Sequence, residues 1–172
     1  MILRMRNRFT ILFVIAAAIL LQACEFDKKE KARKLSTELT SVNDSMYQLG
    51  RVWLEEFKVA VNTKDFSELP QNRQNLSAFI DRKIEYISKM EDIGGSEEYR
   101  KAELDILQFE KNTVLPKFVI FESFGDSTTD EEIAEAYNLL MSTINTEQEK
   151  LNKVYKLRDE YARKNEFPLP VE

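Results

Sequence analysis

The chain has 172 residues, with 25 lysines and arginines against 30 aspartates and glutamates, one cysteine and no histidine. The missing histidine excludes Ser-His-Asp and Cys-His nucleophiles, histidine-ligated zinc and Glu-x-x-His di-iron sites, and the single cysteine excludes an internal disulfide. Phosphate-cradling and dinucleotide-binding glycine motifs are missing as well. The composition therefore predicts no metal site and no cofactor, and it favours a protein that is not an enzyme.

Residues 1–23 have the pattern of an export leader. Three arginines, Arg4, Arg6 and Arg8, precede an apolar run over residues 9–21, interrupted only by Thr10. This length fits the apolar region of a signal peptide and falls short of the ~20 residues that a membrane-spanning helix needs. We interpret residues 1–23 as a signal peptide that is cleaved, in preference to a membrane span.

The apolar run ends in Leu21, Gln22, Ala23 and Cys24. These residues resemble the lipobox of bacterial lipoproteins: Leu21 and Ala23 match the pattern, and Gln22 is a less usual residue at its position. The resemblance implies that the Cys24 thiol is lipidated and that Cys24 becomes the first residue of the mature protein. The alternative is an ordinary buried cysteine. A diacylglyceryl group exceeds the two-chain requirement for stable anchoring, whereas one acyl chain gives only marginal binding.

The implied location is the bacterial cell envelope, on the outer membrane in preference to the inner, with the domain in the periplasm or at the surface. Residues 24–34 are then the lipidated cysteine and a charged tether, which either touches anionic lipid headgroups or stays solvated. Without the leader, 22 basic residues stand against 30 acidic ones, a net charge of −8. This balance argues against nucleic acid as a partner. The expected partners are a membrane, through the covalent lipid, and an unidentified envelope protein.

Residues 35–166 predict four amphipathic helices, because apolar residues recur there at spacings of three and four. The first helix is predicted over about 30–62, the second from Pro70 to the glycine pair at 94–95, the third over about 97–124, and the fourth from Thr129 onward. The apolar stripes of the four helices in turn are Leu35, Leu39, Val42, Met46, Leu49, Trp53, Phe57 and Ala60; Leu76, Phe79, Ile80, Ile84, Ile87, Met90 and Ile93; Tyr99, Ala102, Ile106, Phe109, Val114, Phe118 and Phe121; and Ile133, Tyr137, Leu140, Ile144, Leu151, Val154 and Tyr161. Short turns between such helices predict an all-α, up-down-up-down four-helix bundle, followed by a tail over residues 167–172.

Several residues predict where these helices end. Gly94 and Gly95 are expected to stop the second helix as a left-handed cap, and Ser96 to cap the third. Thr129 with Glu132 three residues later predicts a capping box at the start of the fourth. Pro116 lies inside the third helix and predicts a kink or a short break there.

Two groups of residues are candidates for a site. Pro116, Phe118, Phe121 and Phe124 lie in the most apolar stretch of the body and could surround an apolar ligand at the kink, or they could simply be core. The polar residues Glu147 and Arg158 fall on the apolar stripe of the fourth helix, either as buried groups of a site or with their ends in water. Trp53 is expected to pack in the core, with a partner-binding anchor as the alternative.

The leading hypothesis is a lipid-anchored envelope protein whose non-enzymatic helical bundle binds a partner or has a structural role. Beyond the leader, the body resembles small uncharacterised helical lipoproteins of Gram-negative bacteria. The alternative is a carrier or sensor that binds a small apolar ligand in the bundle near Pro116.

Overall fold

A computed structural model describes the backbone of residues 2–169 and the side chains of residues 26–169. The predicted signal peptide, residues 1–23, and Cys24 therefore lie outside the described side chains. The elements in chain order are α1 (Ile2–Thr63), α2 (Leu69–Ser88), α3 (Glu97–Phe109), the π-helical turn η1 (Glu110–Val114), α4 (Leu115–Phe121) and α5 (Asp130–Lys164). Residues 2–169 contain no strand, which confirms the all-α prediction. No helix in the described part of the chain is both long and apolar enough to cross a membrane.

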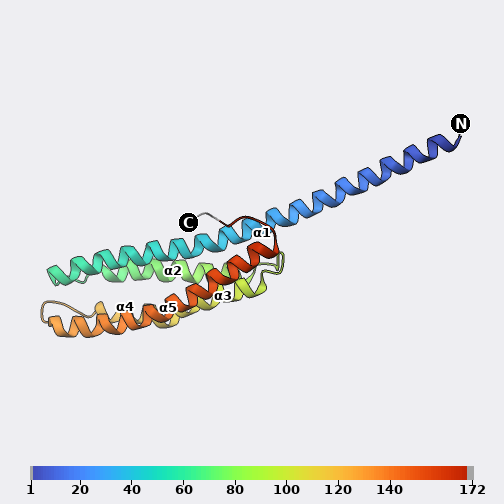
Figure 1. Cartoon of the computed structure of the whole chain (residues 1–172). Coiled ribbons are helices and arrows are strands. Elements are labelled where there is room, and N and C mark those ends of the chain that lie inside the picture. Colours follow the sequence, from blue (N-terminus) through green and yellow to red (C-terminus); the bar gives the residue numbers. More distant parts are fainter. Residues whose placement is uncertain (1, 170–172) are drawn as a thin grey trace.

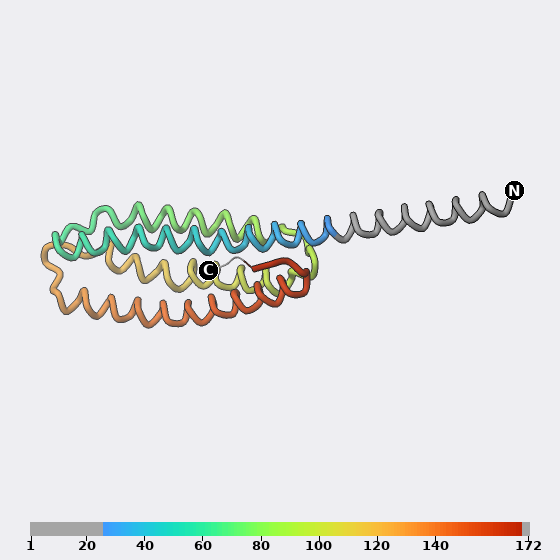
Figure 2. The backbone as a smooth tube through the Cα atoms, turned by 45° about the horizontal axis from the view of Figure 1, so that its top comes forward, coloured from blue at the N-terminus to red at the C-terminus, as the bar shows by residue number. Residues whose placement is uncertain are grey.

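The helices pack side by side as an elongated helical bundle (Figures 1 and 2). Helix α1 packs along α2, α2 along α3, and α3 along α5, while η1 and α4 continue the line of α3. Helices α1 and α5 also touch, but they approach each other over a shorter stretch than the other neighbouring pairs. The seam between α1 and α5 is therefore the most open one in the bundle.

The core confirms most of the predicted apolar stripes. In α1, the stripe from Leu35 to Ala60 is buried except for Leu49, which is half-buried. Trp53 is the centre of an aromatic cluster: its ring stacks on Phe118 with 3.8 Å between centroids and on Phe57 at 5.4 Å. The core also includes the tail residue Phe167, whose ring packs edge-on against Tyr161.

The predicted end of the second helix is wrong by several residues. Helix α2 ends at Ser88, and the segment 89–96 is a loop in which Gly94 and Gly95 both have positive φ. Ser96 does not cap α3 with its side chain; instead, its backbone N–H and its hydroxyl both donate to Asp92 Oδ1. The Arg100 guanidinium donates to the Met90 carbonyl and ties this loop to α3. The glycines therefore shape a hydrogen-bonded loop instead of a helix cap.

The capping box at the start of α5 is confirmed. The Thr129 hydroxyl oxygen accepts from the Glu132 backbone N–H at 3.2 Å, and the Glu132 carboxylate accepts from the Thr129 backbone N–H at 2.8 Å. Three acidic residues in this first turn, Asp130, Glu131 and Glu132, also suit the positive end of the helix dipole.

Replacing Thr129 with alanine is therefore expected to lower the free energy of unfolding by about 1 kcal/mol, because the Glu132 backbone N–H loses its side-chain acceptor. Urea denaturation of Thr129→Ala and of Thr129→Ser measures this loss. The serine variant keeps a hydroxyl at the cap and should stay within a few tenths of a kcal/mol of the wild type, on the order of the natural spread among capping residues. Equal losses in both variants would contradict the capping role.

The predicted break near Pro116 takes the form of a π-helical turn. Residues Glu110–Val114 form η1, and the Leu115 N–H donates to the Glu110 carbonyl five residues earlier. Pro116 then occupies the first turn of α4, where its missing N–H is tolerated. The extra residue in this turn changes which side chains of the third helical segment face inward, and it brings Glu110 into the interior. Such π turns are frequent at functional sites.

A cavity between α1 and α5

The open seam between α1 and α5 contains a cavity of about 600 Å³. Residues of α1 and α5 form its two sides, and Leu76, η1 and α4 form its floor. Its volume lies within the range of small-molecule sites. The lining residues are Asn43, Asp44, Met46, Tyr47, Gly50, Arg51, Trp53, Leu54, Leu76, Glu110, Val114, Phe118, Tyr137, Leu140, Met141, Ile144, Glu147, Gln148, Leu151 and Tyr155.

The wall of the cavity is mainly aromatic and aliphatic. Trp53 and Phe118 form its inner part, and Tyr47, Tyr137 and Tyr155 line the rest. Tyr47 is 64% exposed and Tyr137 is 37% exposed, so both lie at the mouth. The wall therefore offers ring faces both in the interior and at the entrance.

Gly50 contributes to the space in this seam. It lies in the interior of α1, where glycine costs about 1 kcal/mol relative to alanine. A Cβ atom built on Gly50 meets no other group within 4 Å. No close helix contact requires this glycine, so its effect on the structure is to leave room beside the cavity.

Two acidic side chains from different elements meet at the cavity. Glu110 of η1 is 5% exposed and Glu147 of α5 is half-buried, and both line the cavity. Burial raises the pKa of Glu110 well above its usual range, and the nearby Glu147 carboxyl raises it further by charge repulsion and by a shared hydrogen bond. The Oε2 atom of Glu110 has no hydrogen-bond partner among the described residues. The pair is therefore an acidic group with unused acceptor capacity in an apolar site.

A second acidic group lies deeper, behind Asn43. The Asn43 amide Nδ2 donates to Glu103 Oε1 at 2.7 Å, and both side chains are buried. Burial raises the pKa of Glu103 to about 8, although the hydrogen bond from Asn43 acts in the opposite direction. Because Nδ2 is engaged by Glu103, the Asn43 oxygen is left without a partner among residues 26–169, and Asn43 lines the cavity. Among the described residues that line the cavity, the polar atoms without a hydrogen-bond partner are thus mostly acceptors, namely Glu110 Oε2 and Asn43 Oδ1. The Trp53 indole N–H is an unpaired donor.

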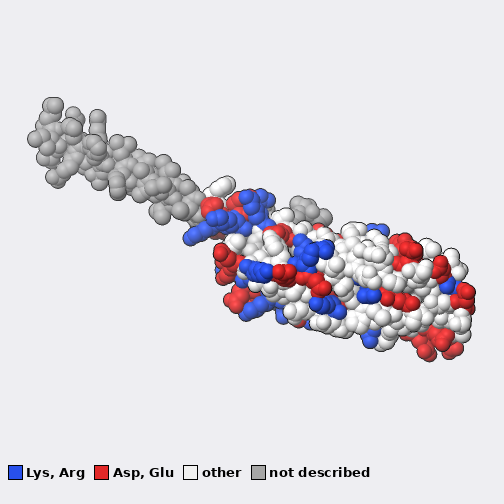
Figure 3. All heavy atoms as spheres, turned by 180° about the vertical axis from the view of Figure 1, so that it is seen from behind, with Lys and Arg blue, Asp and Glu red and all other residues white. Residues whose placement is uncertain are grey.

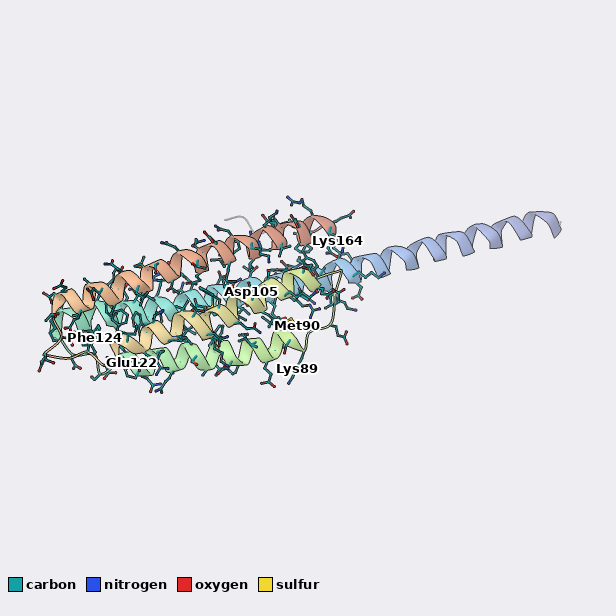
Figure 4. All side chains as sticks on the ribbon, turned by 90° about the horizontal axis from the view of Figure 1, so that it is seen from below. Lys89, Met90, Asp105, Glu122, Phe124 and Lys164 are labelled. Atoms are coloured by element: carbon teal, nitrogen blue, oxygen red, sulfur yellow. The ribbon has the colours of Figure 1, made fainter. Side chains whose placement is uncertain are left out.

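The structure separates the residues of the predicted apolar pocket. Only Phe118 lines the cavity, while Pro116 is exposed on the opposite side of α4. Phe121 is fully buried against Trp53 and Phe57. Phe124 packs edge-on to Phe66 at the end of the bundle near the α4–α5 turn (Figure 4). The cavity therefore lies on the α1–α5 side and includes only Phe118 of these four residues.

Of the two polar residues on the predicted stripe of α5, Glu147 lies at the cavity and Arg158 does not line it. Arg158 is buried, its Nε donates to Asp159 Oδ1 at 3.0 Å, and its guanidinium lies over the Tyr155 ring. The sequence interpretation missed Glu110 altogether. The signal for it was the spacing of five between Phe109 and Val114 in the third stripe, which is too long for an α-helical turn and suits a π turn.

Among residues 26–169, no group of three acidic, cysteine or histidine side chains is placed to hold a metal ion. Comparison of the chain with models of protein families, with curated proteins and with solved structures finds no match in any of the three. The function must therefore be argued from the leader and from the cavity.

Proposed function

We propose that this protein is a lipoprotein of the bacterial cell envelope, anchored through lipidated Cys24, whose non-enzymatic up-down-up-down bundle binds a partner or has a structural role. The observation that carries the proposal is the lipobox-like sequence Leu21-Gln22-Ala23-Cys24 behind a signal-peptide pattern. The anchored location is a membrane of the envelope, the outer in preference to the inner. A signal peptidase would remove residues 1–23.

The described part of the chain is compatible with such an anchor. Among the described side chains, the first core residue is Ala32. Residues 27–31 are exposed or half-buried and hold the Asp27–Lys31 ion pair at 2.7 Å. Figure 3 shows basic and acidic side chains mixed where the described chain begins, and mainly acidic ones at the opposite end of the bundle. The basic side chains at the first end could contact anionic headgroups, and the mainly acidic end would lie away from them.

Replacing Cys24 with alanine is expected to abolish incorporation of radiolabelled palmitate and to release the protein from the membrane fraction. The reason is that the alanine variant has no thiol to carry the diacylglyceryl group that anchors the protein. Palmitate labelling and fractionation of the expressing cells measure both effects.

Gln22→Ser is the matched control, because it changes the lipobox at the position where a small or polar residue is tolerated and leaves the thiol in place. It should label like the wild type. Undiminished labelling of the Cys24→Ala protein would refute the anchor.

The cavity favours a second candidate function, a carrier or sensor for a small molecule with an apolar part. The support for this candidate is the cavity of about 600 Å³ beside half-exposed apolar residues of α5. Neither a neighbouring helix nor a side chain at Gly50 fills this seam. A cavity of this volume with an aromatic and aliphatic wall suits a small-molecule ligand. This function is compatible with an envelope anchor and does not depend on it.

Filling the seam at Gly50 tests this second candidate. Gly50→Leu places a side chain in the open space and is expected to lower the affinity for an environment-sensitive apolar dye by at least about tenfold, a change of ~1.4 kcal/mol. Gly50→Ala is the control: it should keep dye binding and raise the free energy of unfolding by about 0.5–1 kcal/mol through helix propensity. Dye titration by fluorescence gives the affinities, and unsaturable binding to all three proteins would exclude the cavity as a ligand site.

A further inference from the structure

The polar groups at the cavity are arranged for a positive charge. Glu110 and Glu147 meet there from different elements, and Asp44 lies at the exposed edge of α1. Arg51 is the one basic residue on the lining, and it is exposed, so its charge is screened by water. The lining therefore has an excess of acidic groups, and the least exposed charge-bearing group on it is the Glu110 carboxyl.

Unpaired acceptors give independent support. Glu110 and Asn43 are each 5% exposed, and each has an oxygen without a hydrogen-bond partner among the described residues. A buried acceptor without a partner costs about 1–3 kcal/mol, so a donor brought by a ligand would relieve this cost. An ammonium group has several N–H donors and no acceptor, which matches acceptors held by two or three surrounding residues.

The aromatic and aliphatic side chains of the cavity wall also suit an amine with an apolar body. A ligand cation held by the carboxyl pair would share the cavity with the rings of Trp53, Tyr47 and Tyr137, and the faces of such rings attract cations. The aliphatic residues Met46, Leu140 and Ile144 would cover an apolar body. A carboxylate ligand, by contrast, would meet the acidic pair and be repelled.

We propose that the cavity binds an organic cation, a primary or substituted amine with an apolar body, whose ammonium group binds at the Glu110–Glu147 carboxyl pair and by its charge favours the ionised form of these groups. This inference rests on the second candidate function and specifies its ligand class; it is independent of the lipid anchor. Glu110 and Glu147 are binding residues in this scheme, and Asn43 adds an acceptor that Glu103 fixes in orientation by taking the Asn43 amide hydrogen.

Three probes that differ only in their head group test the proposal: hexylammonium, hexanol and hexanoate. Each probe is titrated into a solution of the full chain in a neutral detergent, and the tryptophan fluorescence emission is recorded. Trp53 is the only tryptophan and lines the cavity, so its emission reports occupancy. Hexylammonium is expected to bind saturably and at least about tenfold more tightly than hexanol, because charge-assisted hydrogen bonds are roughly twice as strong as neutral ones. Hexanoate is expected not to bind.

Glu110→Gln and Glu147→Gln keep the side-chain shape and remove the carboxyl group that can ionise beside a bound cation. Each should lower the hexylammonium affinity about tenfold or more and leave hexanol binding unchanged, which also shows that the cavity is intact. Glu149→Gln is the matched control, since Glu149 lies on α5, is exposed and does not line the cavity. It should keep the full preference for hexylammonium.

The outcomes separate the two proposals. Equal binding of hexanol and hexylammonium, a preference for hexanoate, or an amine preference that survives in both glutamine variants would overturn the cation site while leaving a ligand-binding cavity. Failure of all three probes to bind the wild type would overturn both the cation site and the second candidate function.

Discussion

Replacing Trp53 with alanine is expected to lower the free energy of unfolding by about 3–5 kcal/mol, the range for truncation of a large buried aromatic. Trp53 is 1% exposed, stacks on Phe118 and Phe57, and meets Phe121 edge-on at 5.6 Å between centroids. Its removal leaves these rings without their common partner and joins the core to the cavity that it lines. A loss of this size is a large part of the ~5–15 kcal/mol that holds a typical domain folded.

Urea denaturation followed by far-UV circular dichroism measures this loss, because the variant has no tryptophan fluorescence. Tyr47→Ala is the control: Tyr47 lies on the same helix at the mouth of the cavity and is 64% exposed. That substitution should cost less than about 1 kcal/mol. Similar losses in the two variants would mean that Trp53 is not the centre of the core.

Replacing Glu103 with glutamine is expected to make the protein more stable at alkaline pH, by on the order of 3 kcal/mol at pH 9. The pKa of Glu103 is about 8 in the folded protein, against 4.5 for an ordinary glutamate, because the carboxyl is buried. Each pKa unit between the folded and unfolded values corresponds to about 1.36 kcal/mol of stability. The expected gain is smaller than the pKa difference multiplied by this value, because the protein relaxes around a buried charge. The size of the effect follows from the gap between these two pKa values.

The sign follows from which state holds the proton. Between about pH 4.5 and 8 the folded protein keeps Glu103 protonated while the unfolded chain releases its proton. The contribution of this group to stability is therefore complete below about pH 4.5, falls as the pH rises through this window, and is lost above about pH 8. Glutamine is neutral throughout, keeps an acceptor for the Asn43 amide, and removes this fall.

Thermal and urea unfolding of the wild type and of Glu103→Gln between pH 5 and 9 measures the difference. Glu98→Gln is the matched control, because Glu98 is an exposed acid on the same helix. Its pH profile should run parallel to that of the wild type. A parallel profile for Glu103→Gln as well would show that Glu103 is not held neutral by burial.

The helical core could be predicted from the sequence because spacings of three and four directly encode an apolar stripe. The stripes of α1 and α3 are buried almost throughout. The stripe of α5 is different: Tyr137, Ile144 and Leu151 are only partly buried, and all three line the cavity. A stripe predicts which residues face inward, but not whether a neighbouring helix comes close enough to cover them, so the cavity could not be predicted in this way.

The pairing of Glu110, which the sequence interpretation missed, with Glu147 depends on a contact between distant segments. Glu110 and Glu147 are 37 residues apart (147 minus 110), and only the π turn and the packing of α3 on α5 bring them together. The end of α2 was mispredicted for a related reason. The glycine pair suggested a helix cap, whereas the hydrogen bonds from Ser96 to Asp92 and from Arg100 to Met90 favour a longer loop.

The intact mass of the protein extracted from envelope membranes tests the proposed anchor most directly. The proposal predicts a chain that begins at Cys24, with the added mass of a diacylglyceryl group on the cysteine, and of a third acyl chain where the host acylates the new amine. Fragmentation should place the added mass on the first residue. A chain that retains residues 1–23, or one whose Cys24 is unmodified, would contradict the proposal.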